Sequence, residues 1–91
     1  MRIEGYIDHP SLKITVFKMN NRLSVKVESG LYELTYKFRE GMGVENLADV
    51  EKLLDASFLE QSQRQIQQMH LQKMTALRKL NPEEQPFDDI I

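Results

Sequence analysis

The side chains that most often carry catalysis or bind metals are few in this sequence of 91 residues. There is no cysteine, so the chain has no thiolate nucleophile, no thiolate metal ligand and no disulfide. The two histidines, His9 and His70, lie in different halves of the sequence, and neither has a second ligand at metal-binding spacing. Gly41-Met42-Gly43 lacks the further glycines of a phosphate-binding loop. We therefore predict no catalytic residue, no metal site and no cofactor, and hence that the protein is not an enzyme.

The charge balance argues against a dedicated nucleic-acid-binding protein. Fourteen acidic and twelve basic residues give a net charge of −2, without the strong basic excess that such proteins carry. No apolar run approaches the roughly 18 residues that would indicate a membrane span. The start of the chain, Met1-Arg2-Ile3-Glu4-Gly5, does not resemble a secretory signal. We expect a cytoplasmic protein that does not bind membranes.

The first forty residues alternate between apolar and polar side chains with a period of two. β-branched and aromatic residues dominate the apolar positions, as they do in strands that bury one face. These positions are Met1, Ile3, Gly5 and Ile7, then Leu12, Ile14 and Val16, then Leu23, Val25 and Val27, and finally Tyr32, Leu34, Tyr36 and Phe38. We predict a four-stranded antiparallel meander over residues 1–39, with these side chains together on one face.

Three short turns set the expected register of the strands. Asn20-Asn21 can form a two-residue turn because asparagine tolerates positive φ, and Ser29-Gly30 is expected to form another. A four-residue turn, 8–11, joins the first two strands. The expected pairs are Val16–Val25, Ile14–Val27, Val27–Tyr32, Val25–Leu34, Leu23–Tyr36, Ile7–Leu12 and Gly5–Ile14. Every pair places its two residues on the same predicted face.

Residues 46–80 contain neither glycine nor proline and are rich in residues that favour helices. Asn46 is a suitable N-cap, and Asp49 follows in the first turn. A continuous helix of this length would measure about 52 Å, whereas an eight-residue strand spans about 26 Å. We predict an α+β fold in which a long or once-broken C-terminal helix packs on one sheet face and extends beyond it.

The apolar side chains of this segment form two stripes about 110° apart around the helix axis. The first stripe is Leu47, Val50, Leu54 and Phe58, and the second is Leu59, Ile66, Met69, Lys73, Leu77 and Leu80. One straight helix cannot direct both stripes at one flat sheet. Either the helix breaks near 55–57, where Ser57 and Glu60 have the spacing of a capping box, or its second half packs on another surface, such as a second copy of the protein.

Residues 81–91 form an acidic and apolar C-terminal tail beyond a single domain at 1–80. The tail contains four acidic residues and no basic one. It is interpreted either as a solubilising terminus or as a docking segment in which Phe87, Ile90 and Ile91 enter an apolar groove.

The leading hypothesis is a small non-enzymatic module for self-association or protein binding, using the surplus helix and the tail. Its most favoured partner is another copy of the chain, and another protein comes second. The candidate interaction residues are Leu59, Ile66, Met69, His70, Leu77, Leu80, Phe87, Ile90 and Ile91.

The alternative hypothesis is a nucleic-acid-binding accessory protein that uses the outer sheet face. Tyr6 and Phe17 would stack on bases. The basic residues expected near phosphates are Arg2, Lys13, Lys26 and Lys37. Three glutamates expected on the same face, Glu4, Glu28 and Glu33, oppose this hypothesis. A third hypothesis is an enzyme whose site forms only at an oligomer interface; it ranks last because reactive motifs are missing.

Overall fold

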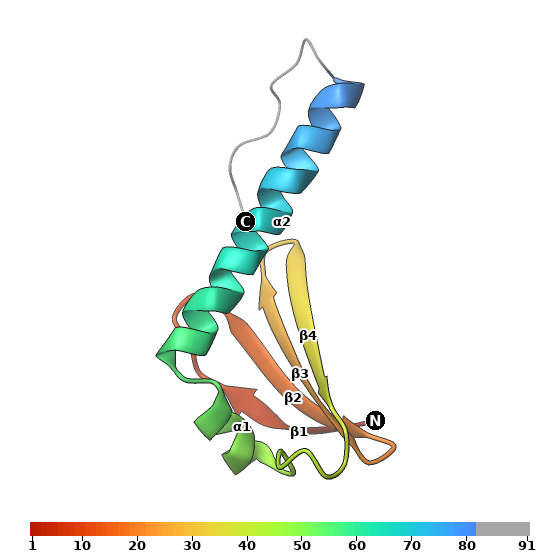
Figure 1. The fold of residues 1–91 in the computed structure, drawn as a ribbon, viewed down its shortest axis with the longest axis vertical. Helices are drawn as coiled ribbons and strands as arrows, with labels where there is room; N and C mark the ends of the chain where they lie inside the picture. Colours follow the sequence, from red (N-terminus) through yellow and green to blue (C-terminus); the bar gives the residue numbers. More distant parts are fainter. Residues whose placement is uncertain (82–91) are drawn as a thin grey trace.

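Four antiparallel strands form one sheet, and two helices follow them on one of its faces (Figure 1). This computed structural model describes residues 1–81. The strands are β1 (Arg2–Ile7), β2 (Lys13–Met19), β3 (Arg22–Ser29) and β4 (Tyr32–Phe38), in the spatial order β1-β2-β3-β4. The helices are α1 (Leu47–Leu53) and α2 (Ala56–Leu80). The predicted α+β class, the meander and the C-terminal helix against the sheet are confirmed.

The register between β2 and β3 is the one that the Asn20-Asn21 turn predicts. Val16 lies opposite Val25, and Ile14 lies opposite Val27. Asn20 and Asn21 have φ of 52° and 61°, the left-handed conformation that a two-residue type I′ loop requires at both positions. The two asparagines are therefore suited to the backbone conformation of the turn that joins these strands.

The other two registers differ from the predictions by two residues. Ser29 pairs with Tyr32, so the second turn is Gly30-Leu31, and Val27 lies opposite Leu34. Gly30 takes the first position of this turn with φ of 57°, a conformation that costs glycine little. Because a shift of two residues preserves the alternation of side chains, the apolar residues of β3 and β4 still share one face.

The loop between β1 and β2 is longer than the predicted turn. Ile7 lies opposite Ile14 rather than Leu12. His9 organises this loop, since its Nδ1 accepts hydrogen bonds from the backbone N–H groups of Ser11 and Leu12, both at 3.1 Å. These side-chain-to-backbone bonds satisfy two donors of the loop and stabilise its wider conformation.

A β-bulge in β1 overturns the prediction that Ile3 faces inward. Ile3 lies opposite Phe17, whereas Gly5 lies opposite Val16, the next residue of β2. Glu4 is the extra residue between them, and it breaks the alternation. Ile3 therefore lies on the outer face with Phe17 and is 52% exposed.

The core lies between the inner sheet face and the two helices. Its buried apolar residues are Leu12, Ile14, Val16, Leu23, Val25, Val27, Tyr32, Val50, Leu54, Leu59 and Ile66. Gly5 allows α1 to approach β1, because a Cβ atom at that position would lie 2.7 Å from Leu47 Cδ2. α1 thus covers the β1 side of the sheet and α2 crosses to β4 (Figure 1).

The helix breaks where the two apolar stripes change phase, as one of the two sequence alternatives proposed. α1 ends at Leu53 and α2 begins at Ala56. The N-cap of α2 is Asp55 rather than Ser57, and its Oδ1 accepts a hydrogen bond from the N–H of Phe58 at 2.9 Å. Asn46 caps α1 as predicted, with Oδ1 accepting from the N–H of Asp49 at 2.9 Å.

The second half of α2 extends beyond the sheet (Figure 1). The molecule is accordingly elongated, with extents of 51 × 26 × 19 Å. Leu71 and Leu80 are exposed on this overhang. Within the described part of the chain, no helix is both long enough and apolar enough to span a membrane.

The Asp55 cap is testable by its contribution to stability. Asp55→Ala should lower the free energy of unfolding by about 1 kcal/mol, because an N–H in the first turn of α2 loses its acceptor. Urea denaturation measures the change, with exposed Gln65→Ala within α2 as the control. Equal stability of Asp55→Ala and Gln65→Ala would show that the Asp55 cap does not stabilise the start of α2.

Candidate functional site

Two polar contacts fix α2 on the inner face of β4. The Tyr32 hydroxyl lies 2.8 Å from His70 Nδ1, and the Tyr36 hydroxyl lies 3.0 Å from Ser62 Oγ. His70 and Ser62 are buried. Polar groups buried in this way need hydrogen-bond partners, which the two tyrosines provide. Lys73 Nζ also lies 5.1 Å from the centroid of the Tyr32 ring, within the range of a cation–π contact.

These contacts have a simple geometric basis that the sequence analysis missed. Eight helical residues from Ser62 to His70 rise about 12 Å, and four strand residues from Tyr32 to Tyr36 span about 13 Å. Matching lengths let both pairs form at once, with α2 antiparallel to β4. The signal in the sequence was that the length of strand between the two tyrosines matches the length of helix between Ser62 and His70. This cluster holds the helix in place and has the character of a structural contact.

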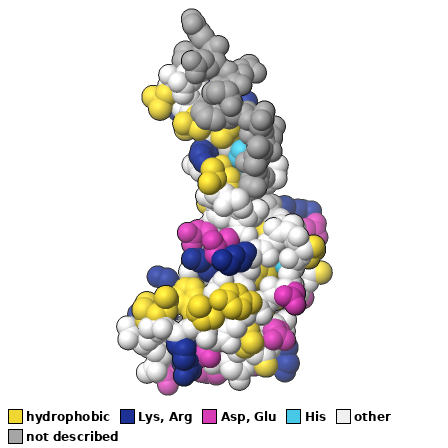
Figure 2. Space-filling view, turned by 180° about the vertical axis from the view of Figure 1, so that it is seen from behind, with side chains coloured by type: hydrophobic (Ala, Val, Ile, Leu, Met, Phe, Trp, Pro, Cys, Tyr) yellow, Lys and Arg dark blue, Asp and Glu magenta, His cyan; other side chains and the backbone are white. Residues whose placement is uncertain are grey.

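The outer sheet face carries an apolar cluster, which we call the outer patch: Met1, Ile3, Tyr6 and Phe17. Ile3 and Phe17 are cross-strand partners, and Tyr6 lies opposite Thr15 in the same two strands. Tyr6 is 59% exposed. Figure 2, which views the molecule from behind, shows hydrophobic side chains gathered in a band on this side.

A shallow hollow of about 230 Å³ lies over the outer patch. Its lining residues are Met1, Ile3, Tyr6, Lys13, Thr15, Phe17, Lys26 and Glu28. Apolar and aromatic side chains thus line the hollow together with two lysines, one threonine and one glutamate. A hollow of this composition suits a ligand that combines large apolar groups with charge.

The outer face is moderately basic around the patch. By strand register, four basic residues and two acidic ones share it: Lys13, Arg22, Lys26, Lys37, Glu28 and Glu33. Lys26 Nζ lies 3.8 Å from Glu28 and 3.9 Å from Glu33, so two carboxylates partly neutralise it. Lys13 is exposed and forms no ion pair within residues 1–81. The most available positive charge at the hollow is therefore that of Lys13.

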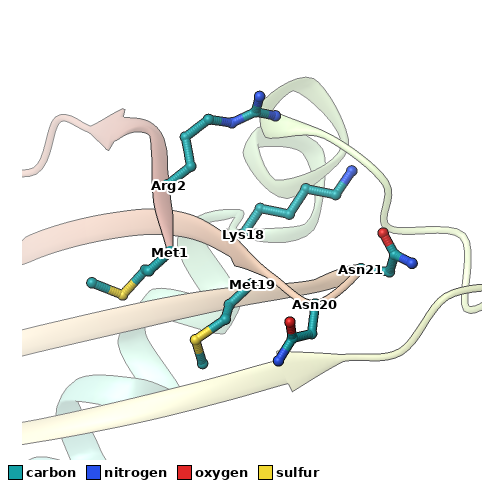
Figure 3. Close-up of a pocket in the computed structure, with 6 residues that line it drawn as sticks. All are labelled: Met1, Arg2, Lys18, Met19, Asn20 and Asn21. Carbon is teal, nitrogen blue, oxygen red and sulfur yellow. The ribbon is translucent and has the colours of Figure 1, made fainter.

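A larger hollow of about 460 Å³ lies at the strand ends beside the Asn20-Asn21 turn. Figure 3 shows that Arg2 and Lys18 extend to one side of the strands while Met1 and Met19 extend to the other. Arg2 also donates to Glu4 at 2.9 Å. The side chains diverge here, so this hollow does not bring chemical groups together. Met19, which is half exposed, instead continues the outer patch toward the turn.

The structure separates the candidate interaction residues into three groups. Leu59, Ile66 and His70 are buried in the chain's own core. Met69 and Leu77 are half-buried, and Leu80 is 78% exposed at the end of α2. Phe87, Ile90 and Ile91 lie outside the described residues.

The structure brings together four of the six candidates for nucleic-acid binding. Tyr6, Lys13, Phe17 and Lys26 all line the hollow over the outer patch. Lys37 lies on the outer face of β4, opposite Ser24. Arg2 lies opposite Lys18, on the other side of the strand ends from Met1 (Figure 3). Sequence reasoning did not place Ile3 at this site, because the bulge that turns it outward does not interrupt the apolar–polar alternation of the sequence.

Among residues 1–81, no group of three His, Asp or Glu side chains is arranged to hold a metal ion. Comparison with protein-family models, with curated proteins and with solved structures finds no match for the chain.

The Tyr32–His70 contact predicts a clear stability effect. Tyr32→Phe should lower the free energy of unfolding by about 1–3 kcal/mol, because it removes the hydroxyl from a buried ring nitrogen. Urea denaturation measures the loss. Tyr6→Phe on the exposed outer face is the matched control and should change stability by less than about 0.5 kcal/mol. A Tyr32→Phe variant as stable as this control would contradict the role given to the contact.

Proposed function

We propose that this chain is a non-enzymatic protein-interaction module that self-associates through the outer patch. The observation that carries the proposal is the outward position of Ile3 beside Phe17, which results from the bulge at Glu4. Contiguous apolar patches on the surface of a small domain mark interaction sites more often than chance exposure does.

The energetics of the bulge support this proposal. Burying an isoleucine side chain fully is worth about 1.5–3 kcal/mol. Ile3 is 52% exposed, so the folded chain leaves about half of that free energy unused. A regular β1 would instead place Ile3 on the inner face with Gly5 and Ile7. A partner that covers the outer patch would recover the burial that the single chain forgoes.

The composition of the outer face also fits a protein interface. Interfaces combine an aromatic and apolar centre with a charged rim. Tyr6 and Phe17 are the aromatic residues at the centre, and Lys13, Lys26 and Glu28 lie around them. The bulge interrupts the edge strand β1, which disfavours pairing of sheets edge to edge. Contact through the face is therefore the more favourable mode of association.

The overhang of α2 supplies a second exposed apolar surface. Leu71 and Leu80 lie on it and are exposed. The leading sequence hypothesis placed association on this surplus helix and on the C-terminal tail. In the present proposal the overhang contributes together with the outer patch.

Substitution of the outer patch tests the proposal directly. Light scattering across micromolar concentrations should give the full chain a mass above the 10.7 kDa of one copy. The double variant Ile3→Ser/Tyr6→Ser should return to 10.7 kDa, because it removes apolar area from the interface. Ile3 and Tyr6 are 52% and 59% exposed, so the variant should lose only part of their burial free energy and remain folded, which thermal unfolding checks.

Leu31→Ser is the matched control for this experiment. Leu31 is 82% exposed in the turn between β3 and β4 and lies outside the outer patch. Its substitution should leave the mass of the full chain unaltered. A full chain of 10.7 kDa at all concentrations, or a patch variant that stays associated, would exclude self-association through this surface.

Binding of single-stranded nucleic acid is the second candidate function. The observation that favours it is the common hollow of Tyr6, Phe17, Lys13 and Lys26. The two carboxylates within 4 Å of Lys26 weigh against it, because they weaken the attraction of phosphates.

Fluorescence anisotropy with a labelled single-stranded oligonucleotide at low salt tests this second function. Nucleic-acid binding requires an affinity that falls as salt rises and that Phe17→Ala or Lys26→Glu reduces at least tenfold. The self-association proposal predicts no such binding. Salt-dependent binding that both variants abolish would favour the nucleic-acid function instead.

A further inference from the structure

We infer that the occupant of the outer patch is the acidic and apolar segment 82–91 of a second copy of this chain. The inference rests on the self-association proposed above and names the segment that makes the contact. Residues 82–91 lie outside the described residues, so only their composition and length, as the sequence gives them, are used.

The segment and the outer patch are complementary in apolar chemistry. The segment contains three large apolar side chains, Phe87, Ile90 and Ile91. The outer patch offers exposed Ile3 and Tyr6 beside a hollow of about 230 Å³. Aromatic and branched aliphatic groups that enter such a hollow remove apolar area from water on both partners.

The two surfaces are also complementary in charge. The segment contains four acidic residues and no basic one: Glu83, Glu84, Asp88 and Asp89. The outer face has twice as many basic as acidic residues, and Lys13 lines the hollow without an ion pair among the described residues. Asp88 and Asp89 directly follow Phe87, so insertion of the phenyl ring would bring both carboxylates toward the lysines at the rim. Opposite charges at a rim guide the approach and set the orientation of a bound segment.

The position of the outer patch favours a contact between copies. Ten residues span at most about 36 Å when fully extended. The end of α2 and Met1 lie toward opposite ends of the molecule, whose long axis measures 51 Å (Figure 1). The outer patch also lies on the face that α2 does not cover, so the segment would have to pass around the sheet. A second copy can offer its outer patch without this detour, and we therefore assign the contact to a second copy.

α2 acts in this arrangement as a rigid arm. Its 25 residues extend about 37 Å and carry its C-terminal end, Leu80, away from the sheet that holds the helix. A second copy can then receive the segment on its outer patch. Reciprocal exchange between two copies closes a symmetric dimer with two identical contacts.

A mixing experiment with full-length variants tests this inference. The patch variant is Ile3→Ser/Tyr6→Ser, and the segment variant is Phe87→Ser/Ile90→Ser. Each alone should self-associate at least tenfold more weakly than the unmodified chain in analytical ultracentrifugation. An equimolar mixture should associate more tightly than either variant alone, because an intact segment then meets an intact patch.

The outcomes separate the inference from the function on which it rests. If the patch variant is monomeric but the segment variant associates like the unmodified chain, the inference is overturned and the proposed function stands. A patch variant that associates normally overturns both. If both variants are monomeric and their mixture does not associate, the two surfaces do not meet and the inference is overturned.

Charge reversal gives a second test that leaves every apolar side chain in place. Lys13→Glu should weaken association at least threefold, more in low salt than in high salt. Asp88→Lys/Asp89→Lys in the same chain should recover most of the loss. Lys79→Glu on the exposed end of α2 is the control for a change in net charge and should have a smaller effect. Failure of the compensating substitutions to restore association would contradict the inferred contact.

Discussion

A sheet of four strands has two faces, and the two helices of this chain cover only one of them. This constraint determines most of the structure. The strand pattern directs Val16, Val25 and Val27 to the covered face, where they are fully buried. The Tyr32–His70 and Tyr36–Ser62 contacts then align α2 with β4. No further helix within the described residues covers the outer face, so side chains placed there remain exposed to solvent or to a partner.

The bulge at Glu4 decides what the uncovered face presents. One additional residue turns Ile3 outward beside Phe17 and so gives the outer face an apolar centre. The overhang of α2 is a separate feature, and it results from the mismatch between a long helix and a short sheet. Together these features leave the single chain with apolar surface that it cannot bury by itself, and they are the physical basis of the proposed self-association.

The sequence predicted much of this fold but only part of the candidate site. Alternation and the Asn20-Asn21 turn were sufficient for the meander, and the change of stripe phase located the break near Asp55. The registers at Gly30-Leu31 and after His9 were missed, because a shift of two residues preserves the pattern of faces. Ile3 was assigned to the wrong face, since the apolar–polar alternation of the sequence continues through Glu4 although the strand bulges there. Ser62 and His70 were not recognised as polar anchors, because their partners lie on a distant strand.

The most direct test of the central claim is intermolecular paramagnetic relaxation. The chain has no cysteine, so Gln85→Cys provides one site for a nitroxide label within the acidic and apolar segment. In a mixture with a ¹⁵N-enriched, cysteine-free copy, the account predicts broadening of the amide signals of Ile3, Tyr6 and Phe17 in that copy. Broadening confined to α2, or its absence at concentrations where the chain is associated, would contradict it.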